Sequence, residues 1–405
     1  MRSRSAVPRR APSERSGSAI SAHCWERSAV TADRLCRVLR VIGAGALTAL
    51  ALVLLSACGS SSVASKRTAV VARTGSAGKV VPLLRLALPD PSAGCRGVHR
   101  LGGGAERIAA TVSDKHGQVA VLVNVCIQGR GPFPFVVDTG ASSTAVDAGL
   151  VKRLGLTKVG QPEKLMGPGC VTDGQEHRVA RWSIAGLPLA PQTLTAVKIP
   201  EMGGPGEPVG VIGSDVFNRF GALRIDFRRR DLVVPGRERA APRRAVLITR
   251  PTISQLPASL IRGAAQFDAP MTVNASPDTV LIGTVVAFGS HQPQEFIPDT
   301  GAVISVVDSA EASLMGLKRL DQRTTQSTIC SVIASPDVLT GPWSIAGNTF
   351  SSASLAGQAL APQSVATMDL GGLRGVGGFL GADQMSRFGS VVFDYSGGRI
   401  LLGAH

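Results

Sequence analysis

Two stretches of the sequence each deliver an aspartate into a tight turn at the end of an apolar run. The first, FVVDTGASSTAVD, extends from Phe135 to Asp147, and the second, FIPDTGAVISVVD, extends from Phe296 to Asp308. The glycine of each Asp-Thr-Gly lets the backbone fold closely beneath the carboxylate. One such turn would usually do no more than connect two strands. Two presented acids in one chain could instead share a proton and act as a general acid and a general base.

The two stretches belong to a longer internal repeat. The sequence numbers of Asp138 and Asp299 differ by 161, and the same separation relates Trp182 to Trp343, which open identical WSIAG pentapeptides. Further along the chain the separation between matching positions grows to 168. A repeat of this length predicts two copies of one structural unit.

The elements that would position these acids are predominantly strands. The chain has 405 residues, 44% of them hydrophobic and 47 of them glycine, which favours two β-rich domains and additional segments. From about Leu101 onward, short runs rich in Val and Ile alternate with Gly, Pro and Asn. Two short helices are predicted, over 147–156 and 308–317. The predicted fold class is therefore all-β.

The charge of the chain is concentrated near its start. The formal net charge is +15, but nine arginines and only three acidic residues precede Cys58. With three Trp and one Tyr in the whole chain, few aromatic side chains could stack on bases, so we expect no nucleic-acid partner. The six histidines show no spacing typical of metal ligands. No metal and no cofactor are predicted.

The N-terminal segment has the pattern of an export signal. Arg37 and Arg40 flank the uncharged run VIGAGALTALALVLLSAC, and its last four residues resemble a bacterial lipobox, in which Cys58 would be lipidated. The alternative is an uncleaved membrane helix, which would give the same topology. Either interpretation predicts a protein exported to the outer face of the bacterial cytoplasmic membrane and anchored there.

Changes in composition give the predicted domain boundaries. They are an export signal with lipobox over 1–58, a flexible tether over 59–100, a first lobe over 101–235, a basic, proline-bearing linker over 236–262 and a second lobe over 263–405.

Each copy of the repeat also carries a later block with an apolar-Gly element. These blocks are VGVIGSDVFNRFGALRIDF, starting at Val209, and GGFLGADQMSRFGSVVFDY, starting at Gly377. Paired with Asp-Thr-Gly, they resemble the bacterial retropepsin-like aspartic proteases, over about 118–235 and 279–403. The resemblance implies two closed β-barrel lobes facing each other about a pseudo-twofold axis.

The resemblance also implies an activity and assigns roles to residues. The chain would be an aspartic endopeptidase that hydrolyses peptides or proteins with a water activated between the two aspartates, one from each lobe. The implied site consists of the catalytic pair Asp138 and Asp299, supported by Thr139, Gly140, Ser142, Thr300 and Gly301. The two threonines would cross-link the loops by hydrogen bonds, and the two glycines would allow close approach. The chain would act as a monomeric pseudo-dimer; the alternative is that each lobe pairs with its twin in another molecule.

The second copy departs from the first at two positions near its acid. Val303 replaces Ser142, whose hydroxyl would hydrogen-bond its carboxylate, and Pro298 replaces Val137. With one donor fewer, Asp299 is predicted to be the proton carrier of the pair. These departures keep open an alternative function, a non-catalytic envelope lipoprotein that holds peptide or cell-wall material between the lobes.

Four cysteines follow Cys58, and in an exported chain an even number predicts disulfides. They are Cys95, Cys126, Cys170 and Cys330, for which three pairings exist. By the resemblance, Cys170 and Cys330 fall in the flap hairpins that cover the site, which implies a Cys170–Cys330 bridge between flaps and a Cys95–Cys126 bridge. Such a bridge would favour extended or terminal substrate segments. Separate buried thiols remain the alternative.

Overall fold

The predicted export signal, including Cys58, lies outside the residues that the structure describes. In the computed structural model of the chain these residues are 79–81, 94–200, 207–240, 242, 244–252, 255–261, 267–329, 331–345, 358–360, 362–371, 373 and 375–403. They fall within one compact unit that starts at Thr74. Over these ranges, every helix is too short or too polar to cross a membrane.

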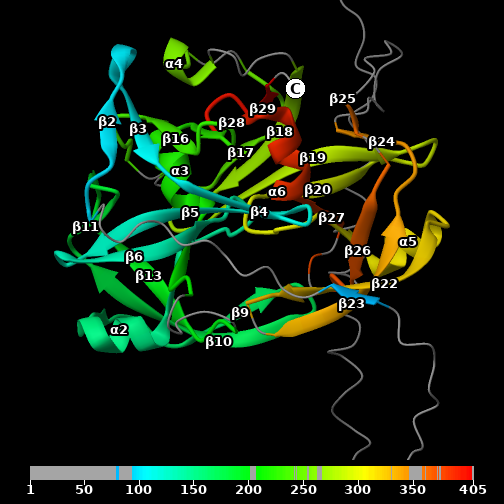
Figure 1. Cartoon of the computed structure of the whole chain (residues 1–405). Helices are drawn as coiled ribbons and strands as arrows, with labels where there is room; N and C mark the ends of the chain where they lie inside the picture. The colour runs from blue at the N-terminus through cyan, green and yellow to red at the C-terminus, as the bar shows by residue number, and fades with distance from the viewer. Residues whose placement is uncertain are drawn as a thin grey trace, which may run out of the picture. The chain divides into compact units, whose positions relative to one another are not determined.

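Strands make up most of the described chain, as predicted (Figure 1). We call residues 105–235 the first half of the fold and residues 267–403 the second half. Most strands of the first half form an 11-stranded sheet. Its strands are β4 (Thr111–Lys115), β5 (Gln118–Ile127), β6 (Arg130–Val137), β7 (Ala145–Asp147), β8 (Thr157–Lys158), β9 (Glu163–Gly167), β10 (Cys170–Val179), β11 (Trp182–Ile184), β12 (Leu187–Leu189), β13 (Gln192–Val197) and β14 (Gly210–Ile212).

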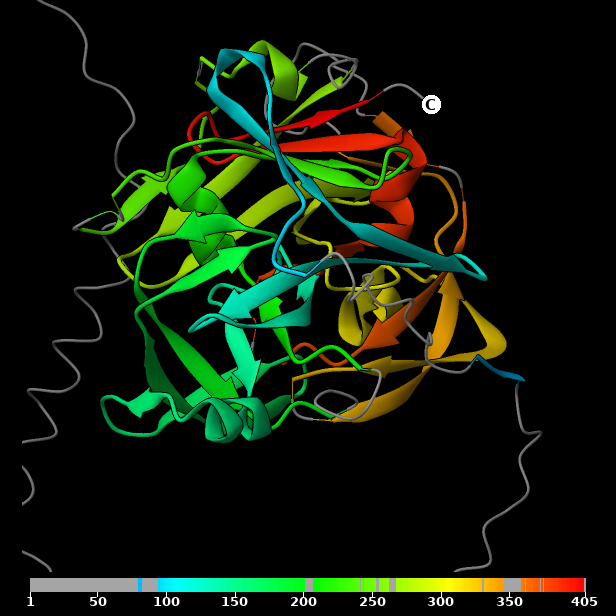
Figure 2. The ribbon, with the colours of Figure 1, turned by 60° about the vertical axis from the view of Figure 1, so that its left-hand side comes forward.

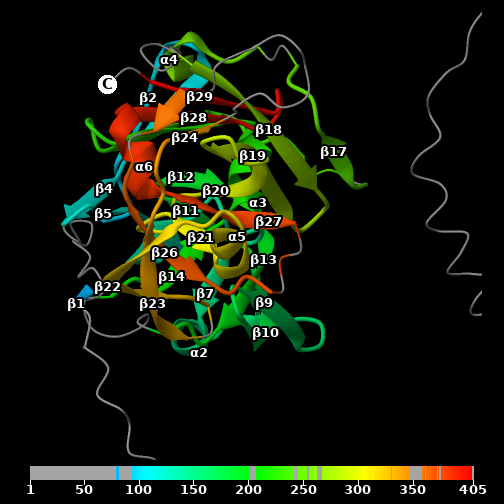
Figure 3. The same ribbon diagram turned by 90° about the vertical axis from the view of Figure 1, so that its right-hand side faces the viewer.

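The other strands are connected in an 18-stranded sheet that contains every described strand of the second half (Figure 3). Its strands are β1 (Lys79–Val81), β2 (Val98–Arg100), β3 (Ala105–Ala109), β15 (Leu223–Asp226), β16 (Asp231–Pro235), β17 (Val246–Ile248), β18 (Phe267–Ala275), β19 (Val280–Phe288), β20 (Gln294–Asp299), β21 (Val306–Asp308), β22 (Lys318–Ser327), β23 (Val332–Leu339), β24 (Trp343–Ile345), β25 (Gln358–Leu360), β26 (Ser364–Met368), β27 (Val376–Gly381), β28 (Ser390–Asp394) and β29 (Arg399–Leu402).

The two halves are joined through one antiparallel strand pair, which we call the seam. In the seam, β15 of the first half pairs with β28 of the second, so that Leu223 lies opposite Phe393 and Arg224 lies opposite Val392. On either side, β16 pairs with β15 and β29 pairs with β28. The strands from both halves therefore form a continuous layer (Figure 2).

The prediction of two closed barrels is wrong. The main path of the 11-stranded sheet is open, with β12 at one end and β8 at the other, and the 18-stranded sheet is not closed into a barrel either. In the seam, β15 of the first half is hydrogen-bonded to β28 of the second half, so this pairing links the two halves instead of closing one of them on itself.

Short helices cover the ends of several strands. They are α2 (Ala148–Leu154), α3 (Ser214–Phe220), α4 (Ala258–Ile261), α5 (Ser309–Leu314), α6 (Ala382–Met385) and the 3-10 turns η2 (Gly102–Gly104) and η3 (Ser386–Phe388). Asp147 caps α2 by accepting the Leu150 N–H (3.0 Å), and Asp308 caps α5 by accepting the Ala310 N–H (2.9 Å). These two helices confirm the predictions over 147–156 and 308–317, whereas α3 and α6 were not predicted.

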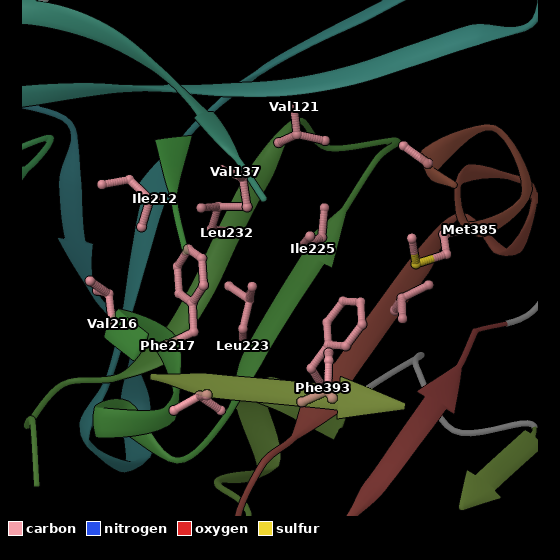
Figure 4. Packing of buried hydrophobic residues seen from close by; sticks show 14 of the residues in the cluster. Val121, Val137, Ile212, Val216, Phe217, Leu223, Ile225, Leu232, Met385 and Phe393 are labelled. Atoms are coloured by element: carbon pink, nitrogen blue, oxygen red, sulfur yellow. The ribbon is translucent and has the colours of Figure 1, made fainter. Parts of the chain in front are cut away.

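The hydrophobic core is continuous across the seam. One cluster of buried side chains contains residues of both halves, from Ile108 to Leu402. Figure 4 shows Phe393 and Met385 of the second half in the same packed group as Leu223 and Ile225 of the first. Because buried apolar area is the main favourable contribution to folding, the packing stabilises the two halves jointly.

Part of the predicted tether takes part in the fold. Strand β1 pairs in parallel with β22, and β2 pairs with β3. Cys95 forms a disulfide with Cys126 on β5, which confirms that predicted bridge. The chain is therefore fixed to the domain well before residue 101, where the sequence placed the start of the first lobe.

Candidate active site

The two aspartates stand at equivalent ends of strands. Asp138 follows β6, which runs parallel to β14, and its backbone N–H donates to Ile212 O (3.0 Å). Asp299 is the last residue of β20, which runs parallel to β27 and places Asp299 beside Gly381. Each acid is thus carried by a strand whose parallel neighbour is the apolar-Gly element of the same half.

The two loops are held together by reciprocal hydrogen bonds from threonine. Thr139 Oγ1 donates to Pro298 O, and Thr300 Oγ1 donates to Val137 O, both at 2.7 Å. Each hydroxyl also accepts the backbone N–H of the other threonine, at 3.1 Å in both directions. The two side chains are 1% and 0% exposed, so water does not compete for these bonds. Removing either hydroxyl would leave one carbonyl and one N–H without a partner.

Glycine after each threonine leaves room for the opposite carboxyl group. A Cβ atom added to Gly140 would overlap the carboxyl carbon of Asp299, and one added to Gly301 would overlap that of Asp138. Either overlap could be relieved only by moving an aspartate carboxyl group of the site, because the overlapping atoms belong to Asp299 and Asp138. The close approach of the two loops therefore requires glycine at both positions.

The carboxyl groups of Asp138 and Asp299 each lie against the glycine of the opposite loop, and a hydrogen bond between them is among the causes that set their pKa values. Both side chains are partly exposed. Burial raises the pKa of Asp138 well above its ordinary value, and the neighbouring Asp299 charge and the hydrogen bond raise this pKa further. Burial also raises the pKa of Asp299, while the hydrogen bond from Asp138 opposes that rise. Two carboxyl groups this close cannot both ionise at low cost, so they titrate as a pair.

Backbone donors favour Asp299 as the ionised member of the pair. Asp299 Oδ1 accepts the N–H groups of Gly301 (2.8 Å) and Ala302 (3.1 Å), whereas Asp138 Oδ1 accepts that of Ala141 (2.8 Å). Hydrogen bonds to a carboxylate stabilise its charged form. The prediction that Asp299 carries the proton counted side-chain donors only, and the backbone donors favour the opposite assignment.

Ser142 and Val303 contribute through their backbones. Ser142 O accepts the Val280 N–H (2.7 Å), and Val303 O accepts the Val119 N–H (2.9 Å), so each loop is bonded to a strand of the other half. The hydrogen bonds of the described residues do not include one from the Ser142 hydroxyl to Asp138. Since any residue supplies a carbonyl, the replacement of serine by valine leaves this crossed pair of contacts intact.

A second layer of hydrogen bonds supports both loops from behind. Thr144 Oγ1 donates to Asp215 (2.8 Å), and Ser305 Oγ donates to Asp383 (2.9 Å). Each of these hydroxyls also accepts a glycine N–H of the apolar-Gly element. The hydroxyl partners of these two aspartates were not predicted. Comparing the two copies could have found them, since Thr144 and Ser305 occupy matching positions of the repeat.

Within the described ranges, no group of three or more His, Cys, Asp or Glu side chains could hold a metal ion.

Two hairpins, one from each half, meet at their tips (Figure 1). The first is β9–β10, whose turn lies between Gly167 and Cys170, and the second is β22–β23. Cys170 Sγ lies 3.5 Å from Thr328 Oγ1, and the Ile329 side chain packs against Gly167. Ile329 also joins the apolar cluster that includes Ala141, three residues after Asp138.

The cysteines at these tips are described only in part. Cys170 is disulfide-bonded. Its predicted partner, Cys330, lies outside the described residues, although Ile329 and Ser331 on either side of it are described. The Cys170–Cys330 bridge therefore stays a prediction.

Comparison with known proteins adds one further observation about the first half. A family model described as aspartyl protease matches residues 123–216, which include Asp138 but not Asp299. Among solved structures, the aspartic proteinase from Irpex lacteus is similar over 74% of this chain and 97% of its own, with 15% sequence identity and a TM-score of 0.39. No curated protein sequence matches the chain. The family match supports a protease function for the part of the chain that carries Asp138.

Proposed function

We propose that the protein is an aspartic endopeptidase in which Asp138 and Asp299 hydrolyse peptide bonds. The observation that carries the proposal is the reciprocal bonding of Thr139 and Thr300, which holds the loops of the two carboxyl groups together. The family match over residues 123–216 supports the same reaction class. A pair of acids that shares one proton is suited to general acid–base hydrolysis of an amide.

The hydrogen-bond donors and the pKa directions support one assignment of the general base and the general acid. Asp299, with more backbone donors, is the carboxylate that takes a proton from the attacking water. Asp138, whose pKa is raised further, is the acid that gives a proton to the scissile carbonyl oxygen. Asp299, now protonated, gives its proton to the nitrogen of the tetrahedral intermediate, the C–N bond breaks, and Asp138 takes back a proton from a hydroxyl of the intermediate as the carboxyl product forms. The pair thereby returns to its starting state, and because water is the nucleophile no covalent intermediate forms.

The same proposal includes a pseudo-twofold relationship between the halves within one chain. Several contacts support it because they occur as crossed pairs: the two threonines, and the carbonyls of Ser142 and Val303 with strands of the opposite half. In the seam, Arg224 faces Val392, and these two positions match each other at the separation of 168 that relates the later blocks. A monomer acting as a pseudo-dimer follows from this arrangement.

The two departures in the second copy do not argue against catalysis. Pro298 acts through its carbonyl, which accepts the Thr139 hydroxyl, and Val303 acts through its carbonyl, which accepts the Val119 N–H. Proline lacks a backbone N–H but keeps its carbonyl. Both residues therefore supply the groups that the site uses.

Access to the site and its cellular location complete the proposal. The hairpin tips lie in contact, and a bridge between them at Cys170 would restrict substrates to extended or terminal peptide segments. The lipobox-like sequence ending at Cys58 supports lipid anchoring at the outer face of the cytoplasmic membrane. The substrates would then be peptides or proteins outside that membrane.

A peptide-library digestion tests the proposed activity. The full chain, purified in detergent, should cleave peptides, and a transition-state-like inhibitor of aspartic proteases should block the cleavage. Asp138→Asn and Asp299→Asn should each reduce the rate by about 10²–10⁴-fold, the usual contribution of general acid–base catalysis. The control is Asp114→Asn, which changes an exposed aspartate on β4 and should cleave like the unchanged chain.

The outcome also separates catalysis from binding alone. Peptide binding without cleavage, unaffected by either asparagine variant, would overturn the endopeptidase proposal in favour of a binding lipoprotein. Full cleavage by Asp299→Asn would show instead that the two aspartates do not act as a pair.

A further inference from the structure

A fully buried serine bonds to the peptide group that follows Thr139. Ser214, the first residue of α3, donates from Oγ to Thr139 O (2.7 Å), and its backbone N–H donates to Ala141 O (2.9 Å). The Thr139 carbonyl belongs to the same peptide group as the Gly140 N–H. Gly140 lies against the Asp299 carboxyl group, and its N–H is a backbone donor that lowers the pKa of both Asp138 and Asp299. The carbonyl of this peptide group therefore accepts a hydrogen bond from the Ser214 hydroxyl, and its Gly140 side lies beside the carboxyl pair.

A tyrosine from the second half completes the arrangement. The Tyr395 hydroxyl lies 2.9 Å from Ser214 Oγ, and its side chain is 1% exposed. Because the Ser214 hydroxyl already donates its only proton to Thr139 O, the Tyr395 hydroxyl must be the donor in its hydrogen bond with Ser214 Oγ. The result is a chain of hydrogen bonds from Tyr395 through Ser214 to the Thr139–Gly140 peptide.

We propose that Tyr395 and Ser214 are positioning residues that strengthen the Gly140 N–H as a donor to the catalytic carboxyl pair. A hydrogen bond accepted by a carbonyl polarises its peptide group, and consecutive hydrogen bonds reinforce one another. A stronger donor stabilises the singly ionised pair, which is the form that activates water. The proposal rests on the function assigned above, because it concerns the same two carboxyl groups.

The equivalent set of residues around the Asp299 loop, one from each half, lacks both hydroxyls. In the repeat of the later blocks, Ala382 is the counterpart of Ser214, and Phe227 is the counterpart of Tyr395. Ala382 keeps the backbone contact, since its N–H donates to Ala302 O (2.9 Å). The hydroxyl relay is therefore specific to the Asp138 loop, and serine with tyrosine is replaced by alanine with phenylalanine as a set.

The charged and titratable groups near the relay come from several elements. They are Asp138 after β6, Asp299 on β20, Asp215 and Arg219 on α3, and Tyr395 itself after β28. Burial raises the pKa of Tyr395, and the charges of Asp215 and Asp138 raise it further. The tyrosine thus stays protonated, as a donor, over the whole range in which the carboxyl pair titrates.

Carbon-13 NMR of aspartate carboxyl groups in the full chain tests the proposal without requiring cleavage. The signals of the pair are assigned by their loss in Asp138→Asn and Asp299→Asn. Ser214→Ala should raise the apparent pKa of the pair by about 0.3 unit, the effect of losing one polarising bond. Tyr395→Phe should raise it by less. The double variant should match Ser214→Ala alone, since the tyrosine acts through the serine.

Thr284→Val is the matched control for loss of a buried hydroxyl. Thr284 is 1% exposed and donates to Pro270 O, away from the pair, so this variant should lose stability with an unchanged carboxyl titration. If Ser214→Ala does not fold, Tyr395→Phe, which removes a single oxygen, still decides the question. An unchanged titration in Tyr395→Phe and Ser214→Ala, or shifts that simply add in the double variant, would overturn the relay. A titration shift in a chain that cleaves no peptide would uphold the relay and refute only the proposed activity.

Discussion

Thr139 and Thr300 each satisfy a carbonyl and an N–H of the opposite half. Thr139 Oγ1 lies 2.7 Å from Pro298 O and 3.1 Å from Thr300 N, and Thr300 makes the corresponding contacts with Val137 O and Thr139 N. All four bonds cross from one half of the fold to the other. The two Asp-Thr-Gly loops are therefore positioned by groups that neither half possesses alone.

Thr139→Val should weaken both the fold and the site. Valine has the shape of threonine but leaves Pro298 O and Thr300 N–H buried without partners, at a cost of about 1–3 kcal/mol for each group. Urea unfolding should show this loss, and the cleavage rate should fall with it. Thr139→Ser keeps the hydroxyl and should retain most of both. Equal stability of the valine and serine variants would contradict the role assigned to the hydroxyl.

The free energy of unfolding should fall as pH rises through the titration of the pair. Burial raises the pKa of both Asp138 and Asp299, so the folded chain keeps protons that the unfolded chain releases near pH 4. The stabilising effect is present below that pH and is lost as pH rises through the folded-state pKa values. Asp138→Asn removes the cost of ionising a buried pair, so it should melt at a higher temperature than the unchanged chain at pH 7.

Melting curves from pH 3 to pH 8 check this prediction. The difference between the unchanged chain and Asp138→Asn isolates the pair from other carboxyl groups, including those of Asp215 and Asp383, whose pKa values are also raised. The prediction fails if Asp138→Asn is the less stable protein at pH 7.

Gly140→Ala should abolish cleavage by displacing the Asp299 carboxyl group. The added Cβ atom would occupy the position of that group, so the two loops must separate. The change removes no hydrogen-bonding group, which predicts a larger effect on the rate than on stability. Gly102→Ala is the matched control, because an added Cβ there meets nothing. Normal cleavage by Gly140→Ala would mean that the loops are not packed as described.

Peptide mapping without reduction should identify two bridges, Cys95–Cys126 and Cys170–Cys330. The first is present in the structure, and the second is expected because Cys170 is disulfide-bonded and touches Thr328, two residues before Cys330. Linkage of Cys170 to Cys24, Cys36 or Cys58 would contradict the predicted bridge between hairpins.

Much of the site could be predicted from side-chain types and their repetition. The pairing of Asp138 with Asp299 and the reciprocal threonines depend on residues that carry visible chemistry. The roles of Pro298 and Val303 could not be predicted in this way, because both act through backbone carbonyls that every residue possesses. For the same reason the sequence could not show the backbone donors that favour Asp138 as the carrier of the shared proton.

The sequence correctly predicted a fold made mostly of strands, but it did not predict that the sheets would stay open instead of closing into barrels. Alternating Val and Ile indicate strands, and capping aspartates indicate α2 and α5, yet neither pattern specifies which strand a free edge will meet. The pairing of β15 with β28 joins positions far apart in the sequence, such as Arg224 and Val392, which no local pattern encodes. The Ser214 and Tyr395 relay did leave a signal, since both positions change together between the copies.

The seam between β15 and β28 also determines how the chain could be divided. The basic segment that starts at Arg237 follows β16, and its described residues before β17 belong to no strand, so a cut there would break no pairing within the seam. Two separately made polypeptides, one ending near residue 240 and the other beginning there, should therefore recognise each other through the seam and the paired threonines. Each would bring a single aspartate, and only their reassembly would restore a working site.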